Sequence, residues 1–463
     1  MSKKQHTDNY TFLTTGPIGP VILTMAVPTI ISMLVTSLYN IVDTFYAGRI
    51  GTSATAAVGI VFPVMSIMQA IGFFFGQGSG TYISRCLGAK KMDDAGRMAS
   101  TAFYCSIGAG IFIAVAGLIF LEPLSVALGS TPTILPYTKD FLGIILLGTP
   151  FVTASMTLNN QIRFQGNAAY SMLGIMSGAI LNVVTVPILT FSFGLGIKGA
   201  AIGTLIGQIA GFLVLLAMTR HGGNIRLSLK NFTKESRFYI EIFKGGTPSL
   251  SRQGLASIAT LMLNLAAGAY GDSAIAGMSI VSRISFVVFS IIIGLGQGFQ
   301  PMCGFNYGAG LYDRVRKGYF FCLKSGLDFL AVICVPGFVF AEEIVDLLRH
   351  DVEVVAIGAP ALRWQIITYP LAAFITVSNM ALQTSGRSIP ANILAACRNG
   401  IFFIPLILLL PHCLGLKGVE ICQSVADAFS FAVAIPLMIN YFRSIPKANG
   451  QEVTTPVPGP KQP

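Results

Sequence analysis

The sequence contains little charge. Only 11% of its 463 residues are Asp, Glu, Lys or Arg, whereas soluble domains carry roughly 25%. Hydrophobic residues make up 53% of the chain. This composition excludes an ordinary soluble domain and indicates an integral membrane protein, because there is too little polar surface to cover the chain in water.

Motifs for common chemistries are also absent. The four histidines fall in different segments, and neither an H-E-x-x-H nor a C-x-x-C pattern occurs. The chain lacks the G-x-x-x-x-G-K-[ST] loop that holds nucleotide phosphates. These absences argue against a membrane enzyme, a zinc site, a disulfide framework and a nucleotide-driven engine. We therefore expect no cofactor and no resident metal.

Long apolar runs are abundant. Runs of about 20 residues, enough for a helix to cross a ~30 Å hydrocarbon core, recur between short polar breaks. They lie roughly at 18–46, 53–77, 98–121, 139–160, 168–191, 196–219, 245–269, 274–299, 319–341, 355–382, 389–411 and 416–442. A membrane β-barrel would instead show alternating segments of ~10 residues. The sequence therefore predicts an all-α membrane protein with twelve transmembrane helices.

The positive charges are unevenly distributed. With the N-terminus inside, the segments predicted to be cytoplasmic hold 20 of the 30 Lys and Arg residues, including Arg85, Arg163 and those between 220 and 244. The positive-inside rule therefore places both termini in the cytoplasm. It also accounts for the net charge of +11 without a nucleic-acid partner. The first 16 residues do not form a cleavable signal peptide.

The two halves of the chain match each other at an offset of 220 residues. This offset aligns Pro28 with Pro248, the Gly-Gln-Gly at 76–78 with that at 296–298, and Asn159 with Asn379. Since each half has six predicted spans, the two bundles share one orientation and a pseudo-two-fold axis along the membrane normal. The predicted parts are a cytoplasmic N-terminal tail (1–17), an N-lobe (18–220), a basic cytoplasmic linker (221–244), a C-lobe (245–443) and a disordered cytoplasmic tail (444–463).

Two like-oriented bundles suit alternating access, in which the lobes rock about a shared site and expose it to one side at a time. A static scaffold or channel would show the same duplication. Pro28 and Pro248 each remove a backbone hydrogen bond inside a span. They are either fixed kinks or hinges, and their equivalent repeat positions favour hinges.

Charged residues inside spans are the most informative positions. Each costs roughly 2.5–3.5 kcal/mol at a helix centre, so such residues usually face a cavity or a partner. Apart from Asp140 at the outer end of its span, Asp43 is the one acid in the predicted spans of the first half, and its repeat equivalent is Leu263. Tyr39 and Asn40 lie one helical turn earlier on the same face. Such a carboxylate can bind H⁺, hold Na⁺ through oxygens, or simply bridge helices.

The second half carries arginines in its spans. Arg398 and Asp427, in the last two spans, are predicted to form a buried pair. Arg252 is expected to reach toward the cytoplasmic face from the end of its span. Arg283 and Arg363 enter from the outer side and, together with Asn40, are candidates to line a substrate cavity.

Several motifs together resemble the multidrug and toxic compound extrusion (MATE) family, in particular its MepA-like bacterial branch. They are "VDTFYAGRIG", "GQGSGTYISRCLGAKKMDDA", "LNNQIRFQGN", "ILNVVTVP", "GIKGAAIGT", "GTPSLSRQGLASIA", "GDSAIAG" and "GLGQGFQPMCGFNYGAG". The resemblance covers about residues 15–445. It implies an exporter in a bacterial cytoplasmic (inner) membrane that moves drugs against an inward flow of H⁺ or Na⁺. We expect a monomer and amphipathic, cationic substrates.

The resemblance also implies site residues. The family's N-lobe cation site maps onto Asp43 with Tyr39, Asn159, Asn182 and Thr204, and its bending proline maps onto Pro28. Many members have a second aspartate where this chain has Val186. With one carboxylate, H⁺ is favoured over a weakly held Na⁺. The alternatives are a flippase for lipid-linked oligosaccharides or other anionic substrates, and a passive channel.

Overall fold

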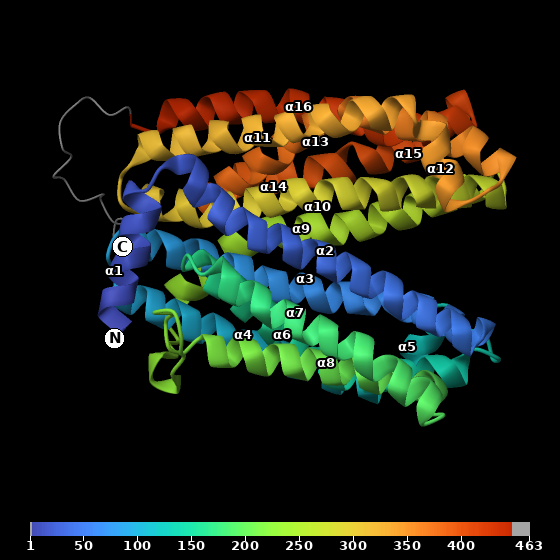
Figure 1. The fold of residues 1–463 in the computed structure, drawn as a ribbon, viewed down its shortest axis with the longest axis horizontal. Coiled ribbons are helices and arrows are strands. Elements are labelled where there is room, and N and C mark those ends of the chain that lie inside the picture. Colours follow the sequence, from blue (N-terminus) through green and yellow to red (C-terminus); the bar gives the residue numbers. More distant parts are fainter. Residues whose placement is uncertain (1, 447–463) are drawn as a thin grey trace.

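The computed structural model describes residues 2–446, except for the side chains of 2–8, 37–44 and 47. The described chain is helical and contains no strand. Its long helices form two bundles that lie side by side (Figure 1). We name them the N-lobe (α2–α8) and the C-lobe (α9–α16), which confirms the predicted fold of two helical membrane bundles.

The N-lobe has six long helices. They are α2 (Ile18–Ile50), α3 (Thr52–Gly88), α4 (Met92–Ile119), α6 (Leu135–Phe164), α7 (Ala168–Pro187) and α8 (Gly196–Met218). A π-helical turn, Ile188–Ser192, extends α7. A 3₁₀ turn, Leu229–Asn231, lies in the connection to the C-lobe.

The C-lobe repeats this order. Its long helices are α9 (Ser236–Gly268), α10 (Asp272–Gly308), α11 (Tyr312–Val339), α13 (Val352–Thr384) and α16 (Leu416–Ser444). A further span consists of α14 (Ser388–Ala396), the π-helical turn Cys397–Ile401 and α15 (Phe403–Leu414). Eleven spans of the described chain are apolar enough to cross a membrane by hydropathy. We count α9, 33 residues long but more charged, as the twelfth.

Three short helices were not expected from the apolar runs. Helix α5 (Leu121–Ala127) and helix α12 (Ala341–Leu348) occupy equivalent places in the two repeats. Helix α1 (Ser2–Thr15) replaces the expected polar tail and lies across one end of the bundles (Figure 1). It touches both lobes, because Asn9 donates to the Gln165 carbonyl at 3.3 Å and the Leu13 carbonyl accepts from Asn306 at 2.9 Å.

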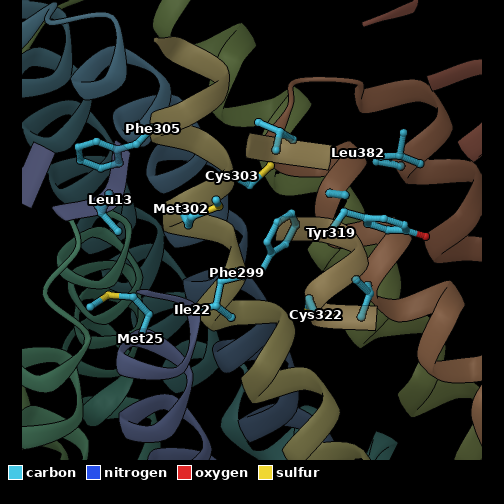
Figure 2. Packing of buried hydrophobic residues seen from close by; sticks show 14 of the residues in the cluster. Leu13, Ile22, Met25, Phe299, Met302, Cys303, Phe305, Tyr319, Cys322 and Leu382 are labelled. Atoms are coloured by element: carbon cyan, nitrogen blue, oxygen red, sulfur yellow. The ribbon is translucent and has the colours of Figure 1, made fainter. Parts of the chain in front are cut away.

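The end of the bundles that carries α1 and Ser444 also carries most of the Lys and Arg residues of the predicted cytoplasmic segments. We name it the basic end. One buried apolar cluster joins the lobes there, with Ile22 and Met25 of α2 packed near Phe299 and Met302 of α10 (Figure 2). Toward the opposite, far end, the buried clusters belong to one lobe each. The described packing therefore holds the lobes together at the basic end.

Glycines allow this close approach. A Cβ added at Gly298 of α10 would lie 2.5 Å from Ala26 Cα of α2. The repeat-equivalent contact sets Gly78 of α3 against Gly246 of α9, where an added Cβ would lie 3.1 Å from the Gly246 nitrogen. Small residues let membrane helices pack backbone to backbone. The two contacts are related by the 220-residue offset, so the seam between the lobes follows the pseudo-two-fold axis.

Replacing Gly298 with alanine should open this seam. The added methyl overpacks it, which typically costs about 1–3 kcal/mol, or roughly 5- to 150-fold in the closed population. Closure can be followed as the rate at which a bifunctional maleimide cross-links an Asp94→Cys, Arg237→Cys pair in a cysteine-free background, because Arg237 Nη2 of α9 lies 3.1 Å from Asp94 Oδ1 of α4. Gly59→Ala is the control, since nothing lies within 4 Å of its added Cβ. Equal cross-linking in both variants would refute this account of the seam.

Candidate transport site

Two of the predicted cation-site residues meet in the N-lobe. Asn182 of α7 donates from Nδ2 to Thr204 Oγ1 of α8 at 3.2 Å, and Thr204 donates in turn to the Ala200 carbonyl at 3.0 Å. Both side chains are buried, and Asn182 Oδ1 has no hydrogen-bond partner in the described structure. A buried carbonyl oxygen without a donor is costly. Asn182 Oδ1 is therefore free to accept a proton-bearing group or to face a cation.

The seam next to this pair is apolar. Val186, one turn after Asn182, is buried, and a Cβ on Gly203 of α8 would lie 2.8 Å from it. An aspartate at position 186 would lie in the same α7–α8 seam. Valine instead fills the space with methyl groups, so the described part of the site contributes no second carboxylate.

Asn159 lies apart from the other two. Its Nδ2 donates to the backbone carbonyl of Ser171 at 3.0 Å and to Ser171 Oγ at 2.7 Å. Ser171 and Asn182 are eleven residues apart on α7, which is about 16 Å along the helix axis. Asn379, the repeat equivalent of Asn159, bonds to the Ala391 carbonyl in the same way, at 2.7 Å. This shared bond connects neighbouring helices in both lobes.

The side chains of Tyr39, Asn40 and Asp43 lie outside the described residues. The backbone of α2 continues as a helix through them, and α2 packs against α7. Their predicted part in cation binding stays a prediction.

The two candidate hinge prolines lie inside continuous helices. Pro28 lies on α2 between Ala26 and Ile30, which pack against Gly298 and Gly294 of α10. Pro248 follows the Gly246 contact on α9. Both prolines therefore lie at the seam between the lobes, where a change of bend would move one bundle relative to the other.

A buried arginine also bridges the lobes, and sequence reasoning missed it. Arg163 was expected among the cytoplasmic charges, but it lies within α6 and is only 1% exposed. Its Nη2 donates to Asn160 Oδ1 at 2.6 Å, and its Nη1 donates to Gln297 Oε1 of the C-lobe. No carboxylate in the described chain pairs with Arg163, and its Nε has no partner.

Glutamines extend this interlobe network. Gln77 of the N-lobe donates to Asn160 at 3.0 Å and accepts from Gln300 of the C-lobe at 3.2 Å. Gln77 and Gln297 are the central residues of the repeated Gly-Gln-Gly motif. That repetition and the basic residue in "LNNQIRFQGN" were the signals available in the sequence.

Ion pairs add further contacts between the two lobes at the basic end. Arg85 of α3 bonds to Glu241 of α9 at 3.0 Å and to the Thr384 carbonyl at 2.8 Å. Glu235 bonds Arg97 of the N-lobe at 2.9 Å, and a hydrogen bond from Arg237 lowers the pKa of the Glu235 carboxyl. A carboxyl with a lowered pKa contributes its pairing energy above its usual pKa and loses it as the pH falls through the lowered value. This pair therefore persists at neutral pH.

The C-lobe arginines differ in their surroundings. Arg398 Nε bonds Asp427 at 2.8 Å, which confirms the predicted pair. Arg363 pairs with Glu342 at 3.1 Å inside the same lobe. Arg283 is exposed on α10 and has no hydrogen bond or ion pair within the described residues.

Arg252 does not reach the cytoplasmic face as expected. It donates from Nη1 to Asn379 Oδ1 at 2.9 Å inside the C-lobe. The reason is the start of its helix: α9 begins at Ser236, nine residues before the predicted span, so Arg252 lies about 24 Å along it.

A family model described as MatE matches residues 28–188 and again residues 248–409, one match in each lobe. The chain belongs to the MATE family. The prediction from the sequence motifs is therefore confirmed, and the protein is a multi-pass membrane member of a multidrug efflux transporter family.

Curated relatives in the MATE family include multidrug export proteins named MepA. That of Staphylococcus haemolyticus is 30% identical over 396 residues, covering 85% of this chain and 87% of the relative. That of Staphylococcus aureus strain MRSA252 is 28% identical over 432 residues, covering 92% and 95%.

Solved structures share the fold. A MATE transporter in complex with MaL6 has a TM-score of 0.88 at 23% identity, covering 94% of this chain and 99% of that chain. A MOP superfamily transporter from Pyrococcus furiosus, described as having a binding pocket of reverse polarity, also has a TM-score of 0.88 at 23% identity, covering 95% of this chain and 99% of that chain.

Proposed function

We propose that this MATE protein is a cation-coupled antiporter that exports amphipathic, cationic organic compounds from a bacterial cell. The observation that carries the proposal is the one-sided closure: buried clusters, glycine contacts and the Arg163 network join the lobes only at the basic end of the described chain. The positive-inside rule assigns that end to the cytoplasm, together with both termini. The substrate binds between the lobes and leaves at the far end.

Coupling runs through the N-lobe. Asp43 is the acid of α2, and Asn182 on the adjoining helix α7 has an oxygen that no described residue bonds. Because Val186 leaves no second carboxylate in the α7–α8 seam, H⁺ is the favoured ion and Na⁺ is held weakly. The relatives named multidrug export proteins support an organic drug as the cargo.

Purified protein in proteoliposomes tests this proposal. An acidic vesicle lumen should drive accumulation of a cationic dye such as ethidium inside the vesicles. An outward Na⁺ gradient alone should drive little accumulation. Accumulation with Na⁺ alone would show that the ion assignment is wrong. No accumulation with either gradient would contradict antiport itself.

A further inference from the structure

The C-lobe contains a small cavity with an excess of positive charge. It is lined by Arg252 of α9, Thr376 and Asn379 of α13, and Arg398 and Asn399 of the π-helical turn, with apolar side chains completing the wall. It holds about 30 Å³ of water-accessible space. That is room for one small polar group, since one water needs roughly 10–15 Å³ on this measure.

Arg398 is already neutralised. Its Nε and Nη2 bond the two carboxylate oxygens of Asp427, at 2.8 and 3.5 Å, and Gln423 donates to the same carboxylate at 3.0 Å. The Arg398 guanidinium also lies 4.4 Å from the centre of the Phe289 ring. This ion pair holds one wall of the cavity in a fixed position.

Arg252 is not neutralised. Its one hydrogen bond goes to the neutral oxygen of Asn379, and no carboxylate lies within ion-pair distance among the described residues. A guanidinium has five N–H donors in a planar fork that matches a carboxylate. Two arginines and one carboxylate leave the site with one unpaired positive charge. An unpaired charge inside a membrane bundle is typical of a site that binds a counter-ion or serves a function.

The repeat shows that this charge is not required by the fold. Ser32 is the N-lobe equivalent of Arg252, and its hydroxyl simply donates to the Pro28 carbonyl at 2.9 Å. The neighbouring bonds of Asn159 and Asn379 are the same in both lobes. Arg252 is therefore particular to the C-lobe within an arrangement that both lobes otherwise share, just as Asp43 in the first half aligns with Leu263 in the second.

We propose that this cavity binds a single negatively charged group of carboxylate size. The Arg252 fork holds the anion, and the Asn399 amide, which makes no hydrogen bond in the described structure, donates to it. The occupant is the acidic group of an amphipathic compound that also carries a cationic group, and this assignment of the occupant rests on the proposed export function. The small volume admits the acidic group and not the body of a drug.

The test is a binding measurement that needs no ion gradient, so its failure is separate from failure of dye transport. Benzoate is titrated into the purified full-length protein in a buffer free of chloride and carboxylates, and binding is followed by calorimetry and by the unfolding temperature. Benzoate should bind saturably and raise that temperature, whereas neutral benzamide should not. Arg252→Gln should weaken benzoate binding at least about tenfold, and Asn399→Ala by about threefold.

Two further variants keep the result interpretable. Arg252→Lys keeps the charge without the fork and should weaken benzoate binding in a folded protein if Arg252→Gln does not fold. Arg316→Gln is the matched control, because Arg316 also donates to one neutral acceptor, the Phe442 carbonyl at 3.0 Å, and should bind benzoate normally.

A chloride titration separates the two sources of a small anion. Benzoate binding that persists in excess chloride assigns the site to an organic carboxylate. Displacement by chloride supports the anion site but assigns it to inorganic anions. Absence of benzoate binding to the wild type, or equal binding in the Arg252 and Asn399 variants, would overturn the proposal.

Discussion

Arg163→Leu is expected to weaken the contact between the two lobes at the basic end without unfolding the protein. The substitution removes the donor to Gln297 across the lobe interface and leaves that oxygen without a partner. A hydrogen bond to a charged group is worth about 1.5–3 kcal/mol, so the closed population should fall roughly 10- to 150-fold relative to the open one. The substitution also removes the desolvation cost of a buried, unpaired guanidinium, which offsets the lost hydrogen-bond energy in the free energy of unfolding. The unfolding temperature should therefore change little.

The same Asp94→Cys, Arg237→Cys pair reports this change. Cross-linking should slow by at least about tenfold in Arg163→Leu, and transport should fall because the lobes no longer close on the cytoplasmic side. Gln383→Leu is a matched control: it is the repeat equivalent of Arg163, but its amide bonds Gly245 and Ser249 within its own lobe. Unchanged cross-linking in Arg163→Leu together with a large loss of stability would mean that Arg163 serves folding alone.

Hydropathy and the internal repeat were sufficient for most of the fold. Apolar runs predicted the twelve spans, because a chain that crosses the membrane must satisfy its backbone hydrogen bonds within each helix. The 220-residue offset predicted the two lobes. Helix α1 and the first turns of α9 were missed, since both are polar. They are stabilised by tertiary contacts at the basic end, such as the Asn306 bond to Leu13, which no local pattern reveals.

The candidate site was predictable only in part. Asn182 and Thr204 lie on adjacent helices and were brought together as expected. Arg163 was assigned to a loop because it lies near the end of its apolar run. Its burial depends on Gln297, 134 residues away in the other lobe, so only the packing of the lobes could show it.

Asp43→Asn is expected to abolish cation-driven export. An amide cannot take up and release a proton, and with Val186 buried in the α7–α8 seam no second carboxylate there can replace it. Exchange of substrate without a gradient needs only the rocking of the lobes, so counterflow of unlabelled against labelled dye should persist. Asp328→Asn, an exposed acid of α11 in the C-lobe, is the control and should leave driven transport intact.

The most direct measurement is dye accumulation in proteoliposomes with an acidic lumen, comparing the wild type with Asp43→Asn. We expect strong accumulation in the wild type and a loss of at least about 100-fold in the variant, equivalent to about 2.7 kcal/mol of coupling. Full accumulation in Asp43→Asn would contradict coupling through this single acid.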